Sequence, residues 1–567
     1  MTETNNQLDS LFNAYYNEGL KLSPAMATFY GDNRYNDLLP AEFTDSYREK
    51  YKDYYTRYLT ALSNFKRESL SENDRLSYDI FQWQLKMNLE ALTQKDNRMP
   101  FNQYNAVPLS VAQFGSGKFI QPFKTVKDYN DWIKRATAFS VWADSAIFYF
   151  RKGMAEGVVL PKALVVKIIP QMNSFVNTDA TKSVFYGPVT NMPDNFSDSE
   201  KVQLTNAYVK LINEQLVPTY QKLRDFLLTE YLPKARTSSG LSAVPGGAAM
   251  YDYDVRLITT THITPDELYN TGLEEVKRIR GEMEKVKEAV GFKGDLNAFL
   301  EYLRTDQKFF PYKTPEEVLT AYRAIQQKIE PELPALFLHT PKTPFEIRQT
   351  ESFRAASASA QYYPGLPDGS RPGIFYVPIV DATKTKIAEE STFAHEAIPG
   401  HHYQAMLQFE NDSLPQFRRH GHFIAFIEGW GLYSESLGKE LGLYTDPYQK
   451  MANLSWEIHR AIRLVVDPGL HTKGWTRERA IKYMMDNEPI TEQAATAEIE
   501  RYMAVPGQAV AYKVGGMKLQ ALRKKYEKEL GSAFDIAAFH DEILKDGAMP
   551  LDILEEKMDA WASTQKK

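Results

Sequence analysis

The spacing of apolar residues predicts a mainly helical chain. Between residues 276 and 290, apolar side chains recur at steps of three and four, which is the period of one helix face: Val276, Ile279, Met283, Val286 and Val290. The preceding Thr264-Pro265-Asp266-Glu267 has the form of a capping box with proline at the first helical position. The aromatic-rich segments 8–16 and 208–227 also favour helix, and we interpret their Tyr and Phe residues as core.

One segment, 345–382, has the pattern of β-strands. Residues 352–363 are rich in small and aromatic side chains, Pro367-Asp368-Gly369 supplies a turn, and 374–380 is a run of β-branched and aromatic residues. Pro378 within that run predicts an edge strand, because proline donates no hydrogen bond to a neighbouring strand. The pattern therefore predicts a small β-hairpin directly before the helix around residue 395.

A cluster of Ser, Gly and Pro at 237–247 is the clearest break in the helical pattern. We place a lobe boundary there, which gives an N-terminal helical lobe over 1–240 and a second lobe over 241–567. Because helical segments lie on both sides of the break, we expect one integrated, two-lobed fold and not two independent domains.

Composition and charge narrow the classes of function. The 567 residues are 43% hydrophobic and 25% charged, as in ordinary globular proteins. With 67 Lys and Arg against 73 Asp and Glu, the net charge of −6 provides no broad basic surface, so we expect no nucleic-acid partner. The densest apolar run, 157–170, contains Lys162 and Lys167 and is too short to cross a bilayer, so we expect no transmembrane segment. The first residues lack the pattern of a secretory signal.

The chain contains no cysteine, which excludes disulfides, thiolate zinc sites and cysteine nucleophiles. Any metal ion must therefore be held by His, Asp or Glu. Seven of the ten histidines fall in one stretch, which is where we look for imidazole chemistry: His395, His401, His402, His420, His422, His459 and His471.

The stretch begins with a variant of a zinc-binding motif. In His-Glu-x-x-His, a step of four residues sets two imidazoles on one helical face, and the glutamate reaches the bound water. Here the fourth residue after His395 is Pro399, followed by Gly400, His401 and His402. Proline and glycine predict a kink or bulge that would return His401 to the face of His395. We rank His401 above His402 as a ligand, but the geometry alone leaves both open.

A third ligand is expected from a later helix, normally as a carboxylate. Glu428 is an acidic residue in the otherwise apolar helical run 426–435, and an acid on an apolar face needs a partner such as a metal ion. Glu435 lies two turns further along the same run, and we expect it to hydrogen-bond one of the ligands from behind.

Four segments of the chain resemble the bacterial family labelled domain of unknown function 885. They are His395-Glu-x-x-Pro-Gly-His401, Glu428-Gly-Trp-Gly-Leu-Tyr-Ser-Glu435, Arg463-Leu-Val-Val-Asp-Pro-Gly-Leu-His471 and 506–515, Pro-Gly-Gln-Ala-Val-Ala-Tyr-Lys-Val-Gly. The resemblance runs nearly end to end and includes 20–39. Its four long motifs occur in the right order, which makes it highly specific.

The resemblance implies a fold and a metal site. The family is generally grouped with gluzincin metallopeptidases and is similar at a distance to angiotensin-converting-enzyme-like and oligopeptidase folds. This implies a mainly α, two-lobed fold with a deep channel and a small β-hairpin or sheet beside the active-site helix. It also implies that His395, His401 and Glu428 bind Zn²⁺, with Glu396 as the general base and His402 behind the ligands.

Further roles follow from the resemblance by chain order and chemistry. Distant relatives use a late tyrosine and a late histidine to stabilise the oxyanion, which implies Tyr512 and His471. Candidates for binding a substrate carboxylate are Arg463, Arg501 and Lys513. The strand at 374–380, with Tyr376, could pair along its edge with an extended peptide.

Three hypotheses of function follow. The first is a zinc-dependent peptidase that uses activated water, with peptides or peptide-like amides as substrates. The second is a metal-dependent amidase or deacylase of small non-peptide substrates. The third is a metal-free, catalytically inactive helical binding protein, which the altered motif spacing supports. The resemblance favours the bacterial cell envelope or periplasm with any signal removed, and the cytoplasm is the alternative. The sequence carries no signal for an oligomeric state.

Overall fold

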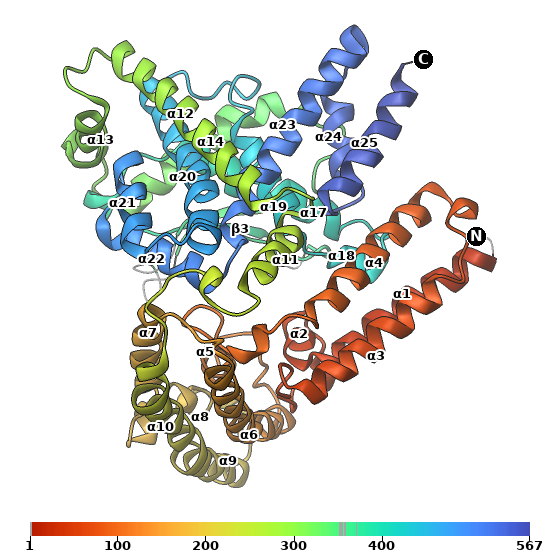
Figure 1. The fold of residues 1–567 in the computed structure, drawn as a ribbon, viewed down its shortest axis with the longest axis vertical. Coiled ribbons are helices and arrows are strands. Elements are labelled where there is room, and N and C mark those ends of the chain that lie inside the picture. Colours follow the sequence, from red (N-terminus) through yellow and green to blue (C-terminus); the bar gives the residue numbers. More distant parts are fainter. Residues whose placement is uncertain (1–2, 351–354, 356–358, 370, 567) are drawn as a thin grey trace.

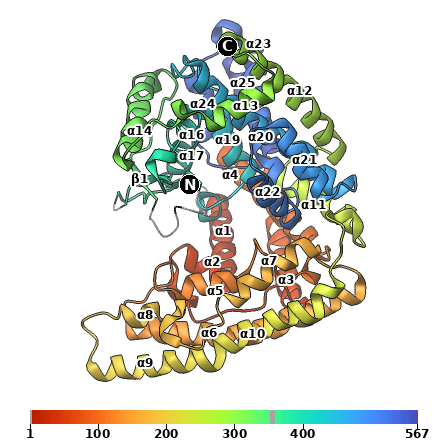
Figure 2. The same cartoon turned by 90° about the vertical axis from the view of Figure 1, so that its left-hand side faces the viewer.

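The computed structural model describes residues 3–350, 355, 359–369 and 371–566. Over these residues the fold is mainly α-helical with one three-stranded sheet, which confirms the predicted fold class (Figure 1). In both views α5 to α10 form the lower part of the molecule and α11 to α25 the upper part (Figure 2). Within the described residues, no helix has the length and apolarity needed to cross a membrane.

Three of the first four helices contribute to a core shared with the C-terminal half of the chain: α1 (Glu3–Leu22), α3 (Asp45–Leu62) and α4 (Glu72–Ala91). The short helix α2 (Pro24–Phe29) instead packs through Ala25 against the cluster of residues 101–231. Phe12 of α1 lies 5.2 Å from Phe81 of α4 and 4.8 Å from Phe417, measured between ring centroids. These rings belong to a hydrophobic cluster that also contains buried residues from 318 to 562. Aromatic burial therefore joins the two ends of the chain.

A second hydrophobic cluster lies within residues 101–231. Its helices are α5 (Val107–Gly115), α6 (Val126–Glu156), α7 (Lys162–Asn173), α8 (Gly187–Thr190), α9 (Asp198–Leu211) and α10 (Val217–Phe226). The long helix α6 begins with a capping box of Thr125 and Asp128 and ends at Gly157, whose φ of 75° suits a residue without a Cβ. The lobe boundary at residue 240 stays a prediction. The first hydrophobic cluster crosses it, since that cluster contains residues 8–85 together with residues 318–562.

The predicted capping box at Thr264 is present. The Thr264 amide donates to the Glu267 carboxylate at 2.8 Å, and the Glu267 amide donates to the Thr264 hydroxyl at 3.2 Å. The helix that follows, α12 (Pro265–Ala289), buries Val276, Ile279 and Met283 in a cluster with α20 (Pro447–Thr472). Helix α13 (Leu296–Thr305) packs against α12, whereas α11 (Gly247–Thr259) contacts α20 and α14 (Pro315–Ile329) contacts β1 (Phe345–Gln349) and α16 (Glu390–Glu396).

The sheet has the order β1-β3-β2, with β1 (Phe345–Gln349) parallel and β2 (Gln361–Tyr363) antiparallel to β3 (Gly373–Val377). The predicted β2–β3 hairpin is confirmed. The edge position predicted from Pro378 is wrong, because β3 is the central strand and Pro378 follows its last residue. Residues 351–354 and 356–358, also predicted as strand, lie outside the described residues.

The remaining helices surround the stretch rich in histidine. They are α16 (Glu390–Glu396), α17 (His401–Phe409), α18 (Gln416–Arg419), α19 (Ile424–Glu435), α21 (Arg477–Asn487), α22 (Glu492–Ala504), α23 (Ala511–Leu530), α24 (Ile536–Leu544) and α25 (Leu551–Gln565). The sheet lies beside α16, since the rings of Phe375 and Phe393 are 5.8 Å apart. Helices α19 and α23 touch through their backbones, because a Cβ on Gly429 would lie 2.6 Å from the Cα of Gly515.

Candidate metal centre

The helix that carries His395 breaks where the sequence predicts. Helix α16 ends at Glu396, and α17 begins at His401 after Ala397, Ile398, Pro399 and Gly400. A Cβ on Gly400 would lie 1.9 Å from the carbonyl oxygen of His395, so the tight path of the chain requires glycine here. The break places the imidazoles of His395 and His401 together, with ring centroids 4.7 Å apart.

The two imidazoles converge on one carboxylate. Oε2 of Glu428, on α19, lies 3.3 Å from Nε2 of His395 and 3.6 Å from Nε2 of His401. Helix α19 approaches α16 closely because Gly431 faces the imidazole of His395, where a Cβ would be 2.7 Å from Nε2. The three predicted ligand residues are therefore neighbours in space.

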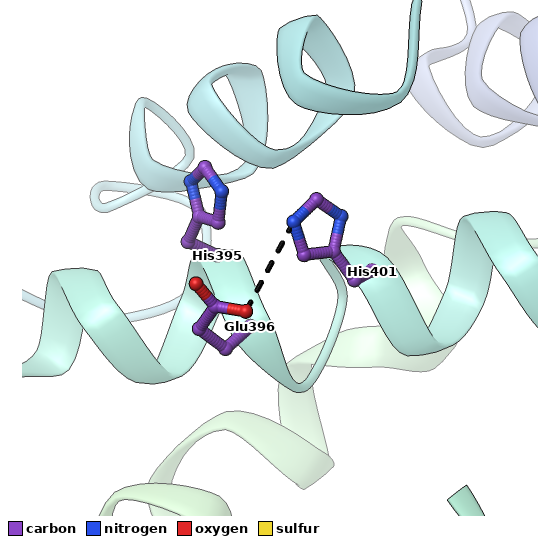
Figure 3. A group of neighbouring side chains, drawn as sticks. All are labelled: His395, Glu396 and His401. Carbon is purple, nitrogen blue, oxygen red and sulfur yellow. Dashed lines mark ion pairs between the residues drawn. The ribbon is translucent and has the colours of Figure 1, made fainter. Parts of the chain in front are cut away.

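A second carboxylate, that of Glu396, borders the same space. Its Oε2 lies 4.0 Å from Nε2 of His401, the contact drawn as a dashed line in Figure 3. The ligand atoms of His395, Glu396 and His401 all lie within 4.8 Å of one another. Both Glu396 and Glu428 are thus near enough to reach a metal ion held by the two imidazoles.

Electrostatics distinguishes the two carboxylates. Burial raises the pKa of Glu396 to about 7, so this group can gain and lose a proton near neutral pH. Burial also disfavours the charge of Glu428, but the hydrogen bond from His395 and the nearby imidazoles outweigh it and lower its pKa to about 2. Glu428 therefore suits a permanently charged ligand, and Glu396 suits a base.

Glu435 fixes the orientation of His395 from behind. Its Oε1 lies 2.7 Å from Nδ1 of His395, and its Oε2 accepts a hydrogen bond of 2.6 Å from the Ser391 hydroxyl. With the Nδ1 proton donated to Glu435, the Nε2 lone pair of His395 can bind a metal ion. Burial alone would lower the pKa of His395, but the carboxylates of Glu428 and Glu435 raise it to about 10. The carboxylates around His395 thus stabilise a positive charge beside its imidazole, and a bound divalent cation would supply one.

His401 provides a further test of fit. Its Nδ1 is buried and has no hydrogen-bond partner among the described residues, and burial lowers its pKa to about 4. A neutral imidazole is the form that binds a metal ion. Two imidazoles and a carboxylate are a ligand set that suits Zn²⁺, so the residues present fit that ion.

His402 lies away from the site, against the sheet. Its Nδ1 is 2.7 Å from the Tyr362 hydroxyl, and its ring centroid is 5.2 Å from that of Phe345. Gly373 of β3 passes close to the same nitrogen. The role predicted for His402 behind the ligands therefore does not match its position, because its imidazole faces a different element.

His471 is also far from the chemistry predicted for it. It is fully buried, with Nδ1 accepting from the Leu241 amide at 3.1 Å and Nε2 lying 3.0 Å from the Tyr502 carbonyl oxygen. Burial lowers its pKa to about 3. Both ring nitrogens are occupied in linking α20 to the connection before α11 and to α22. The oxyanion role predicted for His471 is therefore wrong.

A cavity of about 750 Å³ opens over the metal centre. Tyr512 lines it from α23, and its ring lies near two guanidinium groups, 5.8 Å from that of Arg460 and 4.7 Å from that of Arg463. No hydrogen bond of the Tyr512 hydroxyl is found within the described part of the chain. Its position agrees with a donor to a substrate bound in the cavity.

Two of the four predicted substrate-binding residues line the cavity, and the other two do not. Arg463 and Arg501 line the cavity. Lys513 does not, because it is buried in ion pairs of 2.8 Å with Glu275 and 2.9 Å with Glu457. Tyr376 offers no free strand edge to a peptide, because β3 is paired there with Arg348 of β1 on one side and Gln361 of β2 on the other. The substrate roles predicted for Lys513 and Tyr376 are therefore wrong.

Sequence reasoning missed three residues of α20 that line the cavity together with the predicted Arg463. They are Trp456, His459 and Arg460. Their spacing of three and four residues places them on one face of a helix, which is the signal that could have found them.

The family described as bacterial protein of unknown function (DUF885) matches the chain over residues 24–558. A solved structure of a candidate lipoprotein from Colwellia psychrerythraea is similar over 100% of both chains, with 26% identity and a TM-score of 0.88. A candidate lipoprotein of unknown function from Shewanella oneidensis shares the fold at 20% identity and a TM-score of 0.74, over 97% of this chain and 99% of the other.

A carboxypeptidase from Pyrococcus furiosus aligns with a TM-score of 0.42 and 10% identity, over 100% of this chain and 99% of the other. That likeness is too low to support an assignment of function. A search among curated proteins found no match.

Proposed function

The chain belongs to the DUF885 family of bacterial proteins, and on that premise we propose that it is a zinc-dependent hydrolase that cleaves peptide bonds. The observation that carries the proposal is the convergence of His395, His401 and Glu428 beside Glu396, at the base of a cavity. The set contains three ligands and one additional carboxylate, which is the composition of a catalytic zinc site.

A zinc ion held by His395, His401 and Glu428 would lower the pKa of a bound water and polarise the scissile carbonyl group. The residues of the chain supply the proton transfers. Glu396 takes a proton from the attacking water and passes it to the leaving amine, first as base and then as acid. Burial raises the pKa of the Glu396 carboxyl group, which helps it to hold the proton between the two steps.

Tyr512 and the cavity complete the proposed mechanism. The Tyr512 hydroxyl, which has no hydrogen-bond partner among the described residues, would donate a hydrogen bond to the carbonyl oxygen as negative charge develops on it, which lowers the barrier. The cavity of about 750 Å³ has room for several residues of a peptide. Glu435 keeps the imidazole of His395 in one orientation through the reaction.

The substitution Glu396→Gln tests the proposal, because it keeps the size of the side chain but cannot take up a proton. We expect the variant to bind zinc as the wild type does, while kcat for a short peptide falls by about 10²- to 10⁴-fold. His401→Ala should lose both zinc and hydrolysis, and the exposed Glu332→Gln should lose neither. Hydrolysis at the wild-type rate by Glu396→Gln would contradict the mechanism.

Substrate class is tested with a panel of short peptides and N-acylated amino acids. Hydrolysis of the peptides supports a peptidase. Hydrolysis of the acylated amino acids alone would assign the same site to an amidase or deacylase, since the proton transfers by Glu396 are the same for any amide bond.

A further inference from the structure

Arg460 occupies an unusual place in the wall of the cavity. It is 9% exposed, and its guanidinium group lies 4.8 Å from the ring of Trp456 and 5.8 Å from the ring of Tyr512. One of its nitrogens, Nη2, is 4.0 Å from Oε1 of Glu435, the same oxygen that binds His395. The charge of Arg460 is therefore directly beside the metal centre.

The hydrogen-bonding capacity of Arg460 is largely unused. A guanidinium group has five N–H donors. Within the described residues, Nη1 makes one long hydrogen bond of 3.3 Å to the Trp456 carbonyl oxygen, and Nε is buried without a partner. No carboxylate of the described residues lies within hydrogen-bond distance of Nη2. Burying a charge with so few partners is costly, and a bound anion would offset that cost.

The other cations of the cavity wall differ from Arg460. Arg463 and Arg501 share the carboxylate of Glu498, at 3.2 Å and 2.9 Å. Arg463 also donates to the Tyr502 hydroxyl at 2.9 Å. Lys386 is solvent-exposed. Arg460 is thus the buried cation of this wall that is left without a hydrogen-bonded carboxylate among the described residues.

We propose that Arg460 binds the terminal carboxylate of the substrate, so that the enzyme removes residues from the C-terminal end of peptides. The proposal rests on the proposed function of the same cavity. A planar guanidinium pairs with a carboxylate through two parallel hydrogen bonds, which gives both affinity and orientation. Its nearness to Glu435 and His395 places the bound carboxylate close to the bond that is cleaved.

The rest of the cavity supports an organic carboxylate with an apolar side chain. Apolar residues make up a large part of the lining: Leu300, Leu303, Phe309, Ile387, Met451 and Ile490. Such a surface favours contact with an aliphatic or aromatic side chain over a small hydrated anion. The chemical class that fits is a peptide with a free carboxylate and an apolar C-terminal residue.

A matched pair of substrates tests the proposal: one short peptide ending in leucine, as the free acid and as the C-terminal amide. The zinc-loaded full chain should cleave the acid with a kcat/KM about 10- to 100-fold higher. Arg460→Gln should lower kcat/KM for the acid by a similar factor and lower that for the amide far less, and Arg460→Lys should restore part of the loss. The control is Arg479→Gln, which removes an exposed arginine stacked 4.1 Å over Trp475 and outside the cavity lining. It should change neither rate.

Equal cleavage of acid and amide by the wild type would overturn the proposal without any variant. An equal loss for both substrates in Arg460→Gln would also overturn it, because Arg460 would then act on the reacting centre. If neither peptide is cleaved, the proposed function fails, and a binding measurement decides the inference separately. Zinc-loaded Glu396→Gln should bind N-acetyl-leucine at least about 10-fold more tightly than its amide, a difference that the added Arg460→Gln removes. Equal binding, or none, would overturn the inference.

Discussion

Oε2 of Glu428 lies 3.3 Å from Nε2 of His395, although 33 residues separate them in the sequence. The same oxygen is 3.6 Å from Nε2 of His401. This convergence involves three helices. Helix α16 ends before Pro399 and Gly400, α17 begins after them, and α19 packs across both. Each part of that arrangement can be changed separately, and each change has a different expected effect.

Substitution of each of the adjacent residues His401 and His402 tests which of the two binds zinc. We expect His401→Asn to abolish stoichiometric zinc binding, because its Nε2 faces Glu428. His402→Asn should keep zinc and instead lower the free energy of unfolding by about 1–3 kcal/mol, because the buried hydrogen bond to Tyr362 is lost. Calorimetric zinc titration and urea unfolding of both variants measure the two effects. The opposite pattern would mean that His402 is the ligand.

Gly431 controls the approach of α19 to His395. In Gly431→Ala the new Cβ would lie 2.7 Å from Nε2 of His395, so the imidazole must move. We expect zinc affinity to fall by about 10-fold or more. The control is Gly281→Ala on α12, where nothing lies within 4 Å of the new Cβ. It should keep zinc and gain about 0.5–1 kcal/mol of stability. Unchanged zinc affinity in Gly431→Ala would contradict the placement of His395.

Glu435 is expected to act through His395. Glu435→Gln removes the charge that accepts the Nδ1 proton at 2.7 Å, so zinc affinity should fall by about 10- to 100-fold. Glu440→Gln is the matched control, since Glu440 pairs with Arg523 and not with a histidine of the site. Competition with a chelator of known affinity measures both variants. Equal affinities in the two variants would show that Glu435 does not orient the ligand.

We expect the buried carboxyl group of Asp467 to make the free energy of unfolding depend on pH. It is fully buried, Oδ2 accepts from the Tyr251 hydroxyl at 2.7 Å and the Gly507 amide at 3.0 Å, and Oδ1 has no hydrogen-bond partner among the described residues. Burial raises its pKa from 3.8 to about 7. Because the folded state holds the proton to higher pH than the unfolded state, stability falls as pH rises from about 4 to about 7, by up to about 4 kcal/mol.

Urea unfolding at pH 5 and pH 8 tests this expectation. In the wild type, the titration of Asp467 should lower the free energy of unfolding between pH 5 and pH 8. Asp467→Asn should lack this contribution, because the asparagine does not titrate. Identical pH profiles for the variant and the wild type would show that Asp467 does not hold a proton in the folded state.

Local backbone chemistry made part of the site predictable. Pro399 and Gly400 indicated the break in the helix, and the apolar run around Glu428 indicated a buried acid. The choice between His401 and His402 stayed open, because proline predicts a break but not the direction in which the chain resumes. In the structure that direction depends on the close contact of Gly400 with the His395 carbonyl oxygen.

Long-range contacts account for the wrong predictions. His471 bonds to Leu241, 230 residues earlier, and Lys513 pairs with Glu275, so no local pattern shows that these side chains are already satisfied. The central position of β3 depends on its parallel pairing with β1, which the run around Pro378 does not reveal. Arg460 is a different case, since its spacing from Arg463 was visible and only its unmet hydrogen bonds required the structure.

The zinc content of the purified full chain decides whether His395, His401 and Glu428 hold a metal ion. The protein is saturated with zinc, dialysed against buffer with a weak chelator and analysed by mass spectrometry for metal per chain, beside Glu428→Ala treated in the same way. We expect one tightly held zinc ion in the wild type and a large loss in Glu428→Ala, because that variant removes the charged ligand facing both imidazoles. A wild type that holds far less than one zinc per chain, or a variant that holds as much as the wild type, would contradict this expectation.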